Sequence, residues 1–141
     1  MKAIVLFAHG SRDPQWHRPI QAVAGRVQAQ LAISAQTAAM AAPTNAAATP
    51  QPSVLVACAY LELSTPSLSE AVQNMVDQGC QHIRLVPLFL GVGKHVREDL
   101  PQMLADLAAQ HPSVVFEPLP AVGEHPDLLD LMAQIALADW T

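Results

Sequence analysis

Ala3-Ile4-Val5-Leu6-Phe7-Ala8-His9-Gly10-Ser11-Arg12 opens the chain with an apolar run that stops at a histidine. An apolar run of this length, bounded by a glycine, is typical of a strand buried on both faces of a parallel sheet. Asp13-Pro14 then supplies an N-cap and a first helical residue. Ile20, Val23 and Val27 follow at helical spacing. This stretch therefore predicts a strand followed by an amphipathic helix.

The same pattern of strand and helix repeats along the chain. Further strands are predicted at residues 53–59, 83–90 and 114–116, and each is followed by apolar residues at helical spacing. Strands that alternate with helices form right-handed crossovers and a parallel sheet. The sequence therefore predicts an α/β fold, a three-layer parallel sheet of about four strands with helices on both faces.

The length of 141 residues fits one domain, which we place at residues 1–141. Residues from about 32 to 52 stand apart as a low-complexity insert that is rich in alanine and proline. Alanine can extend the first helix as far as Met40, and Pro43 and Pro50 stop it. We expect a frayed helix end and a mobile loop there.

Composition limits the possible partners. The formal net charge is −5 and the chain has no basic run, which argues against nucleic acid as a partner. No apolar stretch approaches the roughly 20 residues of a membrane span, so no membrane association is predicted. The apolar start is broken at His9, and we interpret it as the first strand of a cytoplasmic protein rather than as a signal peptide. Neither Cys58 nor Cys80 belongs to a CxxC pair, so both are expected to be buried, reduced thiols.

A histidine or a glutamate lies at or shortly after the end of three of the predicted strands. His9 ends the first strand, Glu62 comes after the second, and His95 follows the third through Gly91-Val92-Gly93-Lys94. The carboxyl ends of parallel strands meet at one edge of the sheet, where ligands bind. Imidazole suits divalent transition metals, and the Glu62 carboxylate can complete a metal site or accept a proton. The pattern therefore predicts metal chemistry at this edge.

Three longer stretches resemble the sirohydrochlorin chelatases, the class II cobalt and iron chelatases of the CbiX type. They are His-Gly-Ser-Arg-Asp at 9–13, Tyr-Leu-Glu-Leu-Ser-Thr-Pro-Ser at 60–67, and Pro-Leu-Phe-Leu-Gly-Val-Gly-Lys-His-Val-Arg-Glu-Asp-Leu-Pro at 87–101. The resemblance runs from Lys2 to about Leu131, except for the alanine-rich insert, and the length matches the short, single-domain form.

The resemblance implies that His9 and His95 hold the incoming metal and act in catalysis. Glu62 matches the acidic position after the second strand. By location we add Ser11, Arg12, Lys94 and Arg97 as contacts to the substrate. The implied reaction inserts Co²⁺ or Fe²⁺, with Ni²⁺ as a further candidate, into sirohydrochlorin for cobalamin or sirohaem biosynthesis. It uses no nucleotide and no iron–sulfur cluster, and His9, His95 or Glu62 takes the pyrrole protons.

Because one domain of this size offers half of that family's cleft, we expect a homodimer. An alternative from another class is a metal carrier, which binds Co²⁺ or Ni²⁺ through the same histidines without inserting it. A flavodoxin-like regulatory or phosphate-binding domain is a further alternative, and it predicts no dependence on metal.

The other histidines have simpler interpretations. We expect His17 to be solvated on the first helix and His82 to lie in a solvated turn. His111 is expected at a helix C-terminus. His125 precedes Pro126 in the loop after the fourth strand, at the rim of the predicted site.

Overall fold

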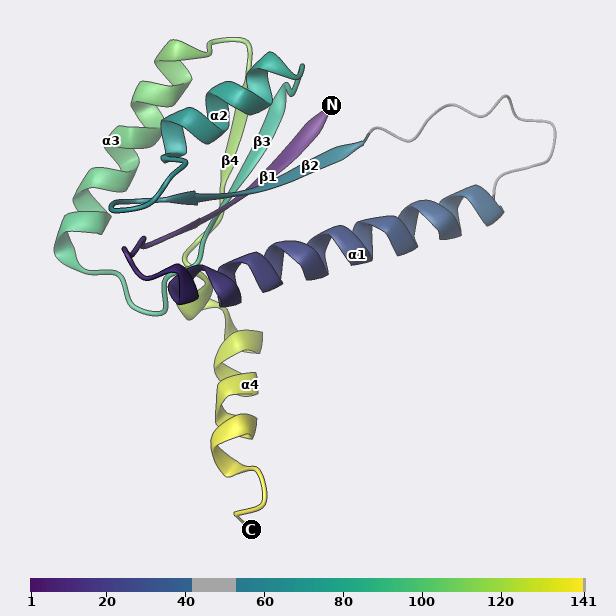
Figure 1. Ribbon diagram of the computed structural model, residues 1–141, viewed down its shortest axis with the longest axis vertical. Coiled ribbons are helices and arrows are strands. Elements are labelled where there is room, and N and C mark those ends of the chain that lie inside the picture. The colour runs from purple at the N-terminus through teal and green to yellow at the C-terminus, as the bar shows by residue number, and fades with distance from the viewer. Residues whose placement is uncertain (42–52, 141) are drawn as a thin grey trace.

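The structure is a computed structural model that describes residues 1–41 and 53–140. Within these residues the chain forms a four-stranded parallel sheet in the order β2-β1-β3-β4 (Figure 1). The strands are β1 (Lys2–Ala8), β2 (Val54–Tyr60), β3 (His82–Pro87) and β4 (Val115–Pro118). The predicted α/β fold and parallel sheet are therefore confirmed.

The opening apolar run forms β1, which lies in the middle of the sheet between β2 and β3. Val5 and Phe7 are completely buried on one face of β1. Leu6 and Ala8 are buried on the other face. A central parallel strand is covered on both sides, and this explains why its sequence lacks polar alternation.

Helices cover both faces of the sheet, as predicted. Helix α1 (His17–Ala41) lies on one face, and α2 (Leu68–Asp77) and α3 (Lys94–Gln110) lie on the other, whereas α4 (Pro126–Leu137) covers neither face. The main core lies between the sheet and helices α2 and α3, where Val72, Met75 and Leu107 pack against Phe7 and Ile83. A smaller cluster lies on the opposite face, where α1 packs over β2 and β1 (Figure 1).

The first helix begins as the sequence predicts. The Asp13 side chain accepts a hydrogen bond of 2.9 Å from the Gln15 amide, and Pro14 opens a short 3-10 turn, η1 (Pro14–Trp16), that leads into α1. Helix α1 continues to Ala41, one residue past the predicted limit at Met40. The remainder of the predicted insert, residues 42–52, lies outside the described residues.

The third strand is shorter than predicted. It ends at Pro87 rather than at Leu90, because a proline has no N–H to donate and the chain turns there. Leu88 still donates from its amide to the Phe7 carbonyl at 2.7 Å, so the chain stays beside β1 for one more residue. Leu90 is 61% exposed and lies in the loop that leads to α3.

Helix α4 extends away from the rest of the molecule (Figure 1). None of its residues is buried. In the part of the chain that the structure describes, no helix is long and apolar enough to cross a membrane.

Candidate metal centre

His9 and Glu62 meet at the carboxyl edge of the sheet, although 53 residues separate them. The His9 Nδ1 atom lies 3.1 Å from Glu62 Oε1. Because a carboxylate only accepts hydrogen bonds, Nδ1 carries the hydrogen, and in the neutral imidazole Nε2 then has the lone pair. A metal-binding histidine commonly donates its other N–H to a carboxylate in this way. The pair therefore presents Nε2 of His9 as a metal ligand.

The backbone and ring of His9 have further fixed contacts. The Trp16 indole Nε1 donates to the His9 carbonyl at 2.7 Å. The His9 ring packs against Phe89, with ring centroids 4.8 Å apart. Phe89 is buried and follows β3. Trp16 thus holds the backbone of His9, while Phe89 and Glu62 orient its imidazole ring.

Ser64 joins the loop after β1 to the loop after β2. Its hydroxyl accepts from the Ser11 amide at 2.9 Å and donates to the Ser11 carbonyl at 2.8 Å. His17 Nε2 lies 2.9 Å from the same hydroxyl oxygen. Since the single hydroxyl hydrogen goes to Ser11, the His17 Nε2–H is the donor in this contact.

The prediction that His17 is solvated is therefore wrong. Its ring is half-buried, and it packs against the buried Tyr60 with centroids 4.7 Å apart. This contact could not be predicted from the sequence, because Ser64 and Tyr60 lie more than forty residues away and their approach depends on strand register. His17 thus supports the loop that carries His9.

Gly10 lies where the loop after β1 passes close to the backbone of the loop after β2. A Cβ atom at this position would lie 1.8 Å from the Glu62 carbonyl oxygen and 2.7 Å from Ser64 Oγ. The Gly10 amide also points at Glu62 Oε1, 3.3 Å away. Only a glycine lets the backbone pass this close to Glu62.

His95 lies in the first turn of α3 and is exposed. It lines a small pocket of about 160 Å³ together with Glu62 and Phe7. Among the described residues, however, no three His, Cys, Asp or Glu side chains are close enough together to hold a metal ion. The structure thus brings His9 and Glu62 into contact and places His95 beside Glu62 without completing a metal cage.

The four expected substrate contacts occupy different positions. Ser11 is half-buried and uses its hydroxyl to accept from the Asp13 amide at 3.1 Å. Arg12 and Lys94 are exposed at the starts of η1 and α3. Arg97 is also exposed but lines a different pocket, of about 270 Å³, that includes Glu124.

An apolar hollow of about 470 Å³ opens beside His9. It is lined mainly by Trp16, Ile20 and Val23 on one side and by Leu88 and Leu90 on the other. Trp16 is 47% exposed although it is a large aromatic residue. A concave site lined mainly by apolar side chains is typical of small-molecule binding.

Both cysteines lie away from this edge. Cys80 is buried, Cys58 is half-buried, and burial raises the pKa of both thiols. A thiol with a raised pKa is a poor nucleophile and a poor metal ligand near neutral pH. The expectation of a buried, reduced thiol is confirmed for Cys80, whereas Cys58 is a free thiol that is only half-buried.

Two of the remaining histidines lie near the positions that the sequence indicates. His111 is the C-cap residue of α3. His125 is the N-cap of α4, and its Nδ1 accepts from the Asp127 amide at 3.2 Å. It is therefore used to begin α4, and no contact joins it to His9.

The interpretation of His82 as part of a solvated turn is wrong. It is the first residue of β3, and its Nε2 lies 3.0 Å from Glu117 Oε2 on β4. Arg84 donates two further hydrogen bonds to the same carboxylate, at 3.1 and 3.0 Å. The strand register pairs Arg84 with Glu117 and so creates this cluster, which lies at a distance from the His9 edge.

The cluster makes the stability of the fold depend on pH. Hydrogen bonds from Arg84 and then His82 hold the pKa of Glu117 below its ordinary value. A lowered carboxyl pKa stabilises the fold above the ordinary pKa of glutamate, and the effect is lost as the pH falls through the folded-state pKa.

We expect Glu117→Gln to lower the Tm at neutral pH, and we expect the Tm values of the variant and of the native chain to converge in acid. Thermal unfolding across pH measures this, with the exposed Glu98→Gln on α3 as control. A Tm gap that stayed constant down to the lowest pH would contradict it.

Comparison with known proteins places this edge in context. Over 84 residues the chain is 29% identical to a protein named sirohydrochlorin cobaltochelatase from Sulfolobus acidocaldarius, covering 60% of this chain and 68% of the relative. It is 32% identical over 78 residues to the chloroplastic sirohydrochlorin ferrochelatase of Arabidopsis thaliana, covering 55% of this chain and 35% of the relative. The chain thus matches between about a third and two thirds of the length of these relatives.

Two solved structures share the fold. A CbiX protein from Marinobacter aquaeolei, described as a putative cobalamin biosynthesis protein, superimposes with a TM-score of 0.71 at 28% identity, over 96% of this chain and 94% of that one. The chelatase SirB from Bacillus subtilis, solved with cobalt, superimposes with a TM-score of 0.68 at 22% identity, over 97% of this chain and 50% of SirB. The sequence model of the CbiX family matches residues 3–137. The chain therefore belongs to the CbiX family.

Proposed function

We propose that this protein is a sirohydrochlorin chelatase, which inserts Co²⁺ or Fe²⁺ into the metal-free tetrapyrrole. The observation that carries the proposal is the His9–Glu62 pair beside an apolar hollow, in a chain of the CbiX family. Its relatives include proteins named as cobaltochelatases and as ferrochelatases. The proposal comprises a single chelatase domain at residues 1–141, a cytoplasmic location and the absence of any further cofactor.

In this proposal His9 holds the metal through Nε2, and His95 supplies a second imidazole at the same edge. Two imidazoles hold a divalent ion without the strong grip that thiolates give, so the ion can be released to the ring. Glu62 orients His9 through the 3.1 Å hydrogen bond.

The macrocycle would lie against the apolar hollow, where Trp16 and Leu90 present exposed apolar surface. Its two N–H protons must leave as the metal enters. His95 and Glu62 line one pocket, and in this proposal they accept these protons. The carboxylates of the substrate would extend toward the exposed side chains of Arg12 and Lys94, and toward the exposed Arg97 that lines the second pocket. Holding metal and ring together replaces a bimolecular encounter with a local step.

We further propose that the active form is a homodimer. The hollow beside His9 is open, and His9 itself is 48% exposed, so one copy encloses its substrate on one side only. A second copy can close the opposite side. The relation to SirB, of which this chain matches half, supports two such units in one assembly.

The experiment mixes purified protein with metal-free sirohydrochlorin and Co²⁺, or Fe²⁺ without oxygen, and follows the absorbance change. We expect insertion faster than in the reaction without protein, and the ratio of the two metal rates indicates the pathway. A rate equal to the uncatalysed one, together with metal binding by the protein alone, would instead identify a metal carrier. A rate equal to the uncatalysed one without metal binding would reject both.

A further inference from the structure

Trp16 takes part in two different surfaces of the site, one through its indole nitrogen and one through its ring. The indole Nε1 donates to the His9 carbonyl at 2.7 Å. The residue also lines the apolar hollow beside His9, and it is 47% exposed. A tryptophan whose N–H is bonded while its ring stays open to solvent is typical of a binding surface. Trp16 thus joins the proposed metal ligand to the hollow in which the ring would lie.

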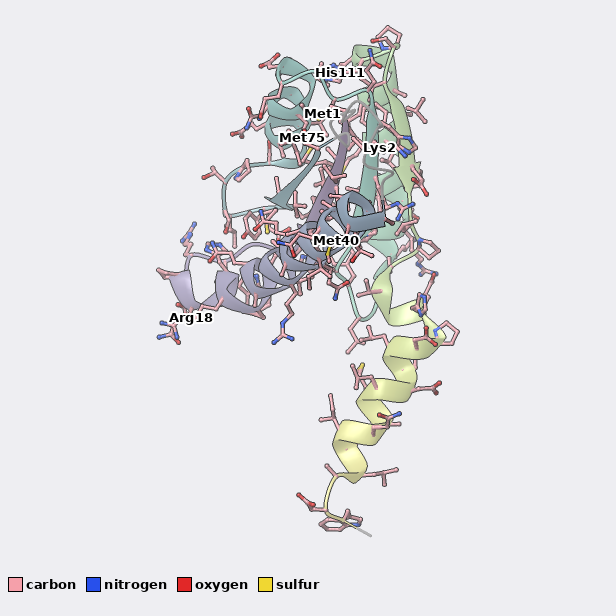
Figure 2. All side chains as sticks on the ribbon, turned by 90° about the vertical axis from the view of Figure 1, so that its right-hand side faces the viewer. Met1, Lys2, Arg18, Met40, Met75 and His111 are labelled. Carbon is pink, nitrogen blue, oxygen red and sulfur yellow. The ribbon has the colours of Figure 1, made fainter. Side chains whose placement is uncertain are left out.

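The short turn before α1 fixes the position of this indole. The Asp13 side chain caps η1, and Pro14 is its first residue. The Trp16 amide donates to the Asp13 carbonyl at 3.0 Å, and this bond closes the turn. Figure 2 shows α1 starting at the edge of the molecule, where the nearby Arg18 points outward. The indole is therefore held by a capped turn at a rim that a ligand can reach from solvent.

The hydrogen bond from Trp16 fixes the peptide group that links His9 to Gly10. The N–H of this peptide group donates to Glu62 Oε1 at 3.3 Å, and its carbonyl accepts from Trp16. Glu62 also accepts from the His9 ring, which packs against Phe89. Loss of the indole N–H would leave the carbonyl side of the peptide group free to rotate. Trp16 therefore determines where the backbone of His9 lies relative to the hollow.

We propose that Trp16 is a positioning residue, which sets the macrocycle in register with His9. A flat ring that stacks on the indole is placed by the same side chain that fixes the backbone of the proposed metal ligand. The distance between the ring and the metal is then set by one rigid group, which favours a local transfer of the metal. This inference rests on the proposed function and adds to it the residue that joins its two binding sites.

Two substitutions separate the two contacts of Trp16. Trp16→Phe keeps an aromatic face in the hollow and removes the N–H donor. We expect it to lower kcat for metal insertion and the affinity for Co²⁺ by about fivefold each, and to leave KM for sirohydrochlorin within about twofold of the native value. Trp16→Leu removes both contacts. We expect it to show the same losses and to weaken binding of metal-free sirohydrochlorin by about tenfold as well.

Calorimetry measures the binding of Co²⁺ and of metal-free sirohydrochlorin separately, and the insertion assay gives kcat and KM. Trp140→Phe and Trp140→Leu are the matched controls, because Trp140 follows α4 and is 83% exposed. Both controls should bind the two ligands and insert metal like the native chain. A residue with a merely structural role would lower every one of these quantities together in Trp16→Phe, whereas a positioning role spares the binding of the ring.

Three results would overturn the inference. They are native kcat and Co²⁺ affinity in Trp16→Phe, native affinity for sirohydrochlorin in Trp16→Leu, and equal loss of ring binding in the two variants. The binding measurements separate this inference from the proposed function, since they need no insertion. If the native chain inserts no metal but the variants follow the expected affinities, only the chelatase is refuted. If the native chain inserts metal and Trp16→Phe matches its kcat, only the positioning role is refuted.

Discussion

His9→Ala is expected to lower the rate of metal insertion by about 100-fold or more, because it removes a proposed metal ligand. Loss of a residue that only supports a metal ligand commonly lowers metal affinity or activity by 10- to 100-fold. The Glu62 carboxylate then has no imidazole to orient, and it remains beside the Gly10 amide. The ring site is unchanged, since the hollow is formed mainly by apolar side chains from α1 and from the loop after β3. The loss should therefore fall on kcat and on metal affinity rather than on sirohydrochlorin binding.

Three measurements on the variant check this. Insertion is followed by absorbance, Co²⁺ binding by calorimetry, and ring binding by quenching of tryptophan fluorescence, since Trp16 borders the hollow. His111→Ala is the matched control, because His111 caps α3 at the other end of that helix from His95. Insertion by His9→Ala at the native rate would remove His9 from the mechanism. Loss of ring binding with metal binding intact would assign His9 to the substrate instead.

Regular structure was predictable because it follows local periodicity. The apolar run at residues 3–8 gave β1, and Asp13-Pro14 gave the start of the first helical segment. The meeting of His9 and Glu62 at one edge follows from a general property of parallel sheets, so the sequence also predicted that proximity. It could not predict that His9 donates to Glu62, because that contact depends on the register of Ala8 with Tyr60.

Contacts that depend on side-chain packing were missed. The Trp16 indole donates to the His9 carbonyl, and the Ser64 hydroxyl bonds to the backbone amide and carbonyl of Ser11, yet neither residue type at those positions signals such a role. His82 was misread for the same reason, since its partner Glu117 lies on another strand. The outward direction of α4 depends on the close approach of Gly123 to Leu90, which no periodicity reveals.

Gly10→Ala is expected to have the largest effect on stability, about 1–3 kcal/mol, because the added methyl group would overlap backbone. The Glu62 carbonyl oxygen would lie 1.8 Å from the new Cβ, and a backbone atom cannot rotate aside as a flexible side chain can. The loop after β1 would have to separate from the loop after β2. That movement breaks the hydrogen bonds between Ser11 and Ser64 and pulls His9 away from Glu62.

The expected fall in Tm is on the order of 2–4 °C for each kcal/mol at this chain length. Gly91→Ala provides the matched control, since a Cβ atom there has no neighbour within 4 Å, and it should unfold close to the native temperature. Insertion activity should fall in Gly10→Ala even well below its Tm, because the His9–Glu62 pair is disrupted in the folded protein. If Gly10→Ala had the native Tm and the native rate of metal insertion, the two loops would be free to separate. Their contact would then not hold the metal centre together.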